Sequence, residues 1–185
     1  AAHESNVTDI VITSNFLLSC GEDKLVKLWD QRAVQAQSTI NTEEAIYALS
    51  ILKNENQIII GTESGRVAIY DLRNSNELFK IVPVQSPVRS ISINPNGDTF
   101  VVGHMNGMLF QYKVDDDDSG KITENFKIKA NNEILLRTSS SPDGKLFATC
   151  GGESAAKIWD FATGKLVNCV SNNAESEWMW DCCFS

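Results

Sequence analysis

Hydrophobic residues occur along the chain in short runs of four to seven, and clusters of turn-forming residues separate the runs. The runs are rich in Val, Ile, Leu and aromatic residues, a composition typical of β-strands. Helical periodicity does not persist beyond a turn or two. The pattern therefore predicts an all-β chain, with strands at residues 7–12, 16–20, 25–29, 46–52, 57–61, 66–70, 88–93, 99–103, 108–112, 135–140, 146–150 and 156–159.

Pairs of a polar residue and a glycine lie between many of these strands. Glycine tolerates the positive backbone angles that tight turns need. Two pairs separate a first strand from a second, and two separate a second strand from a third. We therefore expect tight turns at Asn96-Gly97 and Asp143-Gly144, and at Ser64-Gly65 and Asn106-Gly107.

An aromatic residue closes every third strand, at Trp29, Tyr70, Tyr112 and Trp159, and these positions are 41, 42 and 47 residues apart. A unit of about 40–45 residues is that of one four-stranded propeller blade. The longest interval contains the run Asp115 to Asp118. The spacing predicts repeats over residues 3–41, 42–83, 84–130 and 131–174, with the start of a fifth at 175–185.

Two other all-strand or mixed architectures fit this pattern less well. A parallel sheet needs a helix between consecutive strands, and the connections here are too short for one. A sandwich offers no reason for an aromatic residue at the end of every third strand. In a propeller, each aromatic residue packs at the contact between neighbouring blades.

Composition and charge narrow the function classes. With 42% hydrophobic and 22% charged residues, the chain of 185 residues is typical of a globular protein. Its net charge of −8 argues against nucleic-acid binding, which needs a basic face. No apolar run approaches the roughly 20 residues of a membrane span, and the start of the chain does not resemble a secretory signal. We expect the five cysteines to be reduced core residues of an intracellular protein.

The first repeat carries a complete polar signature: His3 before the first strand, Ser19 in the second, Asp23 in the next turn and Trp29 at the end of the third. On these residues the chain resembles the WD-repeat family, in which they form a buried hydrogen-bond chain. The other repeats depart from the signature, so we expect them to depend more on apolar packing. Their residues at the His position are Thr42, Val84, Asn131 and Glu175, and those at the Asp position are Ser64, Asn106 and Glu153.

Catalytic and metal-binding alternatives are disfavoured. A Ser, a His and an Asp suggest a catalytic triad, but their spacing is that of the structural set, and a nucleophile elbow needs a strand–turn–helix setting. His104 matches no signature position and is expected in a loop or at a strand end. His3 and His104 lie in different repeats, so a His-based metal site is not expected. Four consecutive Asp residues predict a solvated loop and not a calcium site. We expect no enzyme activity and no cofactor.

Three longer stretches resemble the small WD-repeat subunits of the target-of-rapamycin (TOR) kinase complexes. They are NVTDIV…CGEDKLVKLWDQR, FKIVPVQSPVRSISINPNGDTFVVGHMNGMLFQYKV, and EILLRTSSSPDGKLFATCGGESAAKIWDF followed by EWMWDCCFS. The string from Trp178 to Ser185 is the most specific, although Glu175 stands where that family usually has His. The resemblance implies a non-catalytic, cytoplasmic scaffold that binds and stabilises a large TOR-type kinase and reaches internal membranes only through its complex. The alternative is a WD-repeat adaptor that binds peptides or proteins of another complex.

Counting from the His position also predicts a face for binding a protein partner. Residues three and five further on begin each first strand, and the residue before each turn Asp position joins them. Both tryptophans could instead belong to a blade core, because both faces of a blade pack on neighbours. Trp178, Trp180, Tyr47 and Arg89 are of types enriched at binding hot spots. The predicted face consists of Asn6, Thr8, Ala45, Tyr47, Pro87, Arg89, Ile134, Leu136, Trp178 and Trp180, with Glu22, Glu63, Met105 and Gly152.

The count of repeats predicts a partial propeller of about four four-stranded antiparallel blades plus the first strand of a fifth. WD-type rings have 4–8 blades. We therefore expect part of a longer ring, which as a fragment would form either an open arc with unpaired faces or a strained four-blade ring.

Overall fold

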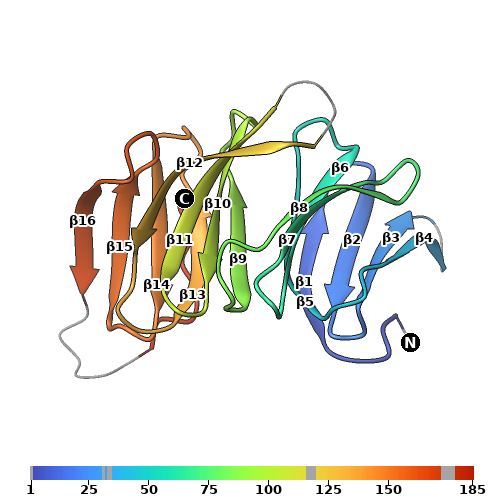
Figure 1. Ribbon diagram of the computed structural model, residues 1–185, viewed down its shortest axis with the longest axis horizontal. Helices are drawn as coiled ribbons and strands as arrows, with labels where there is room; N and C mark the ends of the chain where they lie inside the picture. Colours follow the sequence, from blue (N-terminus) through green and yellow to red (C-terminus); the bar gives the residue numbers. More distant parts are fainter. Residues whose placement is uncertain (1, 31, 33–34, 116–119, 172–177) are drawn as a thin grey trace.

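The computed structural model describes residues 2–30, 32, 35–115, 120–171 and 178–185, and within them sixteen strands form four antiparallel sheets. The strands of each sheet pair in chain order, and we call the sheets blades 1 to 4 (Figure 1). Blade 1 contains β1 (Val7–Ile12), β2 (Phe16–Gly21), β3 (Leu25–Asp30) and β4 (Ala36–Asn41), and blade 2 contains β5 (Ile46–Ile51), β6 (Gln57–Thr62), β7 (Val67–Asp71) and β8 (Asn76–Ile81). Blade 3 contains β9 (Val88–Ile93), β10 (Thr99–His104), β11 (Met108–Val114) and β12 (Ile122–Lys129), and blade 4 contains β13 (Leu135–Ser140), β14 (Leu146–Gly151), β15 (Ala155–Asp160) and β16 (Leu166–Ser171).

The predicted all-β propeller architecture is confirmed, and the glycine turns explain how consecutive strands reverse. The four predicted turn glycines all have positive φ, a conformation that a side chain disfavours. Each closes a tight connection between two paired strands. Their φ angles are 92° at Gly65, 87° at Gly97, 81° at Gly107 and 70° at Gly144.

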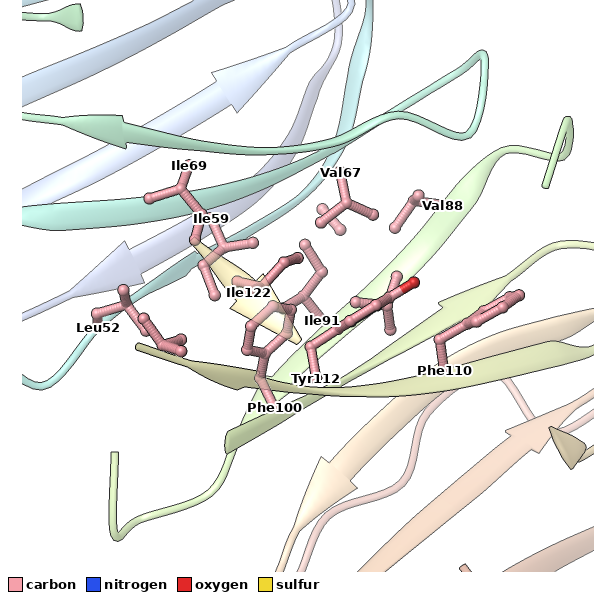
Figure 2. Packing of buried hydrophobic residues seen from close by; sticks show 13 residues of the cluster. Leu52, Ile59, Val67, Ile69, Val88, Ile91, Phe100, Phe110, Tyr112 and Ile122 are labelled. Carbon is pink, nitrogen blue, oxygen red and sulfur yellow. The ribbon is translucent and has the colours of Figure 1, made fainter. Parts of the chain in front are cut away.

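Neighbouring blades pack face to face, and this explains the continuous apolar runs. Along β6, Ile58 and Ile60 pack on blade 1, whereas Ile59 packs on blade 3. Side chains alternate between the two faces of a strand, so a strand covered on both faces must be apolar at every position. The contact between blades 2 and 3 is the largest of the three hydrophobic clusters found in the described residues (Figure 2).

The aromatic residue at the end of the third strand packs towards the preceding blade. Tyr70 packs on blade 1, Tyr112 on blade 2 and Trp159 on blade 3, as predicted. The prediction is wrong for Trp29, which is only half-buried. The described residues contain no blade before blade 1, so its ring lacks that cover.

The sequence analysis predicted four-stranded blades but did not locate the fourth strand of each blade, and it did not predict the conformation of residues 178–185. The fourth strands have at most one buried residue each, and β16 is exposed at every position, so they lack the hydrophobic runs that reveal buried strands. Residues 178–185, predicted as the first strand of a fifth repeat, are not in a strand; no strand in the described part of the chain pairs with them. They lie against blade 4, where the Met179 N–H donates to the Gly151 carbonyl at 2.9 Å.

The cysteines are only partly core residues. Cys20 and Cys150 are fully buried, and burial raises the pKa of the Cys20 thiol to about 12. Cys169 and Cys183 are exposed and Cys182 is half-buried, so the expectation of five core cysteines is wrong for these three. Cys169 lies in β16, and Cys182 and Cys183 lie in residues 178–185, which we call the terminal segment. Few other residues pack against these two parts of the chain. In the part of the chain described here, no helix is long and apolar enough to span a membrane.

Candidate protein-interaction site

The polar signature of blade 1 forms one connected hydrogen-bond chain. His3 Nδ1 lies 2.9 Å from both carboxylate oxygens of Asp23, and His3 Nε2 lies 2.7 Å from Ser19 Oγ. The Trp29 indole N–H donates to the same hydroxyl at 2.9 Å. Ser19 is 5% exposed, so its oxygen is enclosed and already has two partners. The arrangement satisfies polar groups that would otherwise be costly to bury.

Blade 4 retains a shortened form of this chain. The Trp159 indole N–H donates to Thr149 Oγ1 at 3.0 Å, and Thr149 Oγ1 donates to Asn131 Oδ1 at 3.4 Å. Glu153, at the Asp position, accepts a hydrogen bond from the Asn132 N–H and pairs with Lys157. Blade 4 therefore keeps part of the polar chain, although it departs from the signature at the His and Asp positions.

Blades 2 and 3 contain polar networks of other residues. In blade 2, the Glu44 carboxylate accepts hydrogen bonds from Thr62 Oγ1 and Ser64 Oγ, at 2.7 and 2.5 Å. In blade 3, His104 is completely buried at the end of β10, and its Nδ1 lies 2.9 Å from the Ser86 carbonyl. Burial lowers the pKa of His104, so the ring is neutral near pH 7. His104 thus lies at a strand end, as expected, and has a structural role.

The two residue sets of the predicted face are linked in every blade by the same backbone hydrogen bond. The residue before the turn Asp position donates its N–H to the carbonyl of the residue three after the His position. This bond holds the turn between the second and third strands beside the start of the first strand. It joins Glu22 to Asn6 at 3.0 Å, Glu63 to Ala45 at 3.0 Å, Met105 to Pro87 at 2.7 Å and Gly152 to Ile134 at 2.8 Å.

A β-bulge follows at the same place in each first strand. The register of each inner pair skips one residue, namely Thr8, Tyr47, Arg89 and Leu136. A bulge bends its strand and re-aims the side chain of the extra residue. All four skipped residues line one pocket of 260 Å³, together with Glu22, Arg137, Trp180 and Asp181. Residues from four blades therefore converge at one place, which we call the central pocket.

Tyr47 and Arg89 are in direct contact in the central pocket. The Arg89 guanidinium carbon lies 5.5 Å from the centroid of the Tyr47 ring, within the range of a cation–π interaction. Burial raises the pKa of Tyr47, the charges of Glu63 and Glu22 raise it further, and Arg89 opposes them. The tyrosine is therefore neutral, and its ring is a rigid amphipathic surface of the kind that protein partners use.

An acidic hollow adjoins the central pocket. This second pocket has a volume of 630 Å³, and Glu22 and Tyr47 line both. Glu63 lies in the acidic hollow, and Asn6 is tied to Glu22 by a hydrogen bond of 2.9 Å from Asn6 Nδ2. The other residues that line the hollow are Ser5, Lys24, Glu43, Glu44, Ala45 and Ser64.

The two tryptophans are exposed and belong to no blade core. Trp180 is 71% exposed and Trp178 is 44% exposed, and their ring centroids are 5.3 Å apart. Trp180 lines the central pocket, and Trp178 adds its ring beside it. Met105 is 39% exposed at the β10–β11 turn and lies outside both pockets. Glu175, at the fifth His position, lies outside the described residues, as do three members of the Asp115–Asp118 run.

Sequence reasoning missed Arg137 and Asp181, which also line the central pocket. Arg137 Nε lies 3.4 Å from Asp181 Oδ1, and Arg137 Nη1 lies 4.0 Å from Asp9 Oδ1. Burial raises the pKa of Asp9, which the Leu49 N–H and Arg137 partly offset. Arg137 thus connects blade 4, the terminal segment and blade 1. The signal in the sequence was its position beside Leu136, but its contacts with Asp9 and Asp181 depend on the tertiary arrangement.

Four bladed sheets, a His–Ser–Asp–Trp hydrogen-bond chain and bulged inner strands define this chain as a WD-repeat β-propeller. The chain belongs to the β-propeller family described as Nucleolar protein 10-like, N-terminal domain, whose model matches residues 1–138. Residues 127–160 also match the model of the WD domain, G-beta repeat.

Curated relatives cover most of the chain at low identity. The target of rapamycin complex subunit wat1 of Schizosaccharomyces pombe is 27% identical over 85% of this chain and 51% of its own length. The target of rapamycin complex subunit LST8 of Mus musculus is 28% identical over 86% of this chain and 52% of its own length. The mitotic checkpoint protein bub-3 of Caenorhabditis elegans is 27% identical over 80% and 46%. The chain spans about half the length of the curated relatives it matches.

Proposed function

We propose that this chain is a non-catalytic scaffold that binds and stabilises the kinase domain of a TOR-type protein kinase complex in nutrient and growth signalling. The observation that carries the proposal is the similarity to relatives named as target of rapamycin complex subunits, which extends over 85–86% of the chain. Because the chain spans about half of those proteins, the partner is inferred for the parent protein that contains it. A cytoplasmic location belongs to the same proposal.

The interaction face supports a binding role. Tyr47, Arg89 and Trp180 come from blade 2, blade 3 and the terminal segment and line one pocket, so a partner would contact several blades at once. Aromatic and arginine side chains dominate binding energy at protein interfaces. The buried Ser19 hydroxyl and its two partners are structural, which supports a role without catalysis.

Co-purification tests this proposal. The parent protein, affinity-tagged and expressed in its own cells, is expected to recover a very large TOR-type kinase. Trp180→Ala and Tyr47→Ala should each lower that recovery at least about tenfold, because hot-spot residues contribute 2 kcal/mol or more. Leu166→Ala is the matched control, since Leu166 is 53% exposed in β16, away from the face, and recovery should not change.

A second candidate function is an adaptor in another complex. The chain is as similar to the mitotic checkpoint protein bub-3 as to the wat1 subunit, at 27% identity to each. Proteins with different partners can therefore share this propeller, which favours a second candidate. If the pull-down recovers a different complex and no TOR-type kinase, and the same two variants abolish that recovery, the adaptor replaces the kinase scaffold.

A further inference from the structure

Arg89 differs from the other arginines of the chain in its ionic contacts. The sequence contains five arginines, all within the described residues. Four of them form ion pairs. Arg32 pairs with Asp30, Arg66 with Glu44 and Glu77, Arg73 with Asp71, and Arg137 with Asp9 and Asp181. The Arg89 side chain forms neither a hydrogen bond nor an ion pair with the described residues, and its Nε, like that of Arg66, is buried without a partner. An enclosed guanidinium donor without an acceptor is costly, unless a ligand supplies one.

The position of Arg89 shows where an acceptor would come from. Its guanidinium stacks on Tyr47 in the central pocket, whose walls also include Leu136 and Trp180. The pocket has a volume of 260 Å³, which admits one amino-acid side chain. Stacking holds the planar fork in place, and such a fork matches the two oxygens of a carboxylate. The pocket thus holds the Arg89 guanidinium among the rings of Tyr47 and Trp180, Leu136 and several charged side chains.

The charged residues around Arg89 favour a ligand group that carries a single negative charge. The second arginine of the pocket, Arg137, already pairs with Asp9 and Asp181. Glu22 also lines the pocket and accepts hydrogen bonds from Ser5 and Asn6, which hold its carboxylate in place. A phosphate group carries nearly two charges and is usually held by several arginines. Because the Glu22 and Asp181 carboxylates lie nearby, a ligand with one carboxylate matches the charge of one unpaired arginine better than a phosphate group does.

We propose that Arg89 binds the carboxylate of one Asp or Glu side chain, carried by a peptide segment of the protein partner. This inference rests on the proposed function of the face, and it names the chemistry that the face selects. The acidic side chain enters the central pocket, its oxygens accept from the Arg89 guanidinium, and its methylene groups contact Tyr47 and Trp180. The rest of the segment lies across the face, where the adjoining acidic hollow favours basic residues beside the acidic one.

Peptide selection tests the proposal without a known partner. The probe is a phage-displayed library of short random peptides, selected on the purified 185-residue chain. We expect one acidic position to be enriched among the binders. Changing that residue from Glu to Gln in a synthetic peptide should raise its Kd about tenfold to hundredfold by calorimetry, because a charge-assisted hydrogen bond is lost. This measurement needs no protein variant and holds even if substitutions at Arg89 prevent folding.

Two protein variants localise the effect. Arg89→Met keeps the apolar stem on Tyr47 and removes the guanidinium, so it should weaken the Glu peptide by the same factor and leave the Gln peptide unchanged. Arg32→Gln removes the same charge at an exposed site, where the side chain is 89% exposed, and should leave both peptides unchanged. Circular dichroism melting confirms that both variants are folded.

Three results would each overturn the carboxylate site. The first is a selection that shows no acidic preference, and the second is equal affinity of Arg89→Met and the unchanged chain for the Glu peptide. The third is stronger binding of a phosphoserine peptide than of the Glu peptide. A selection that enriches no peptide at all also counts against it. The co-purification experiment separates the two proposals. If the kinase is recovered equally with Arg89→Met, the carboxylate site fails and the scaffold function stands. If no kinase is recovered with the unchanged protein, the scaffold function fails while the peptide affinities still decide on Arg89.

Discussion

Ser19→Ala should destabilise blade 1 by about 2–3 kcal/mol, because the hydroxyl serves two partners at once. It accepts from the Trp29 indole at 2.9 Å and lies 2.7 Å from His3 Nε2. An ordinary hydrogen bond contributes about 1 kcal/mol, and a buried polar group left without a partner costs about 1–3 kcal/mol. The His3 side chain is 1% exposed and cannot reach water without a local opening, whereas half-buried Trp29 can. The larger part of the loss therefore comes from the imidazole.

Urea unfolding followed by Trp fluorescence and circular dichroism measures this loss. For a chain of this length, 2–3 kcal/mol corresponds to a fall in Tm of about 4–12 °C. Trp29→Phe and the double variant complete a cycle, in which we expect a coupling of about 0.5–1.5 kcal/mol. The exposed Ser14→Ala is the matched control and should change stability by less than about 0.5 kcal/mol. A loss for Ser19→Ala no larger than that of the control would refute the structural role of the hydrogen-bond chain.

Two further substitutions test the packing between blades 2 and 3 and the His3–Asp23 contact in the hydrogen-bond chain of blade 1. Gly61→Ala would place a Cβ 2.2 Å from Val88 Cγ1 across the contact of blades 2 and 3, so thermal melting should show a loss of about 1–3 kcal/mol; an unchanged Tm would contradict the close approach. Burial alone would raise the pKa of Asp23, but hydrogen bonds from His3 and the Glu4 N–H outweigh it and leave the pKa below the usual 3.8. Stability from ionised Asp23 is therefore present above pH 4 and lost as pH falls through the lowered pKa. Asp23→Asn should remove this part of the acid dependence in melts between pH 7 and pH 2, and an identical pH profile would argue against the hydrogen bonds to the Asp23 carboxylate.

Local patterns determined much of the fold. The runs at 57–61 and 99–103 predict buried strands because both faces of a blade are covered, and the turn glycines mark the reversals between strands. The recurring aromatic residue identified the repeat, since each blade needs one at the contact with the preceding blade. The fourth strands were not located because they have at most one buried residue each, and such strands carry no continuous apolar signal.

The lining of the central pocket was predicted only in part. Counting from His3 found Tyr47 and Arg89, because the same bulge recurs at the same offset in every blade. It could not find Arg137 and Asp181, whose places depend on how blade 4 and the terminal segment approach blade 1. The polar networks of Glu44 and His104 also follow no shared pattern, since each uses whatever partner the fold brings near.

The sequence by itself determined the all-β class, the repeat length and the polar chain of the first blade. Each of these depends on contacts within one repeat, and residue spacing along a strand encodes such contacts directly. Only the tertiary structure decided that Trp29 is half-buried, that Trp178 and Trp180 are exposed, and that Arg89 contacts the Tyr47 ring but no carboxylate. These properties depend on which blades and loops meet, and no spacing within a single strand records that.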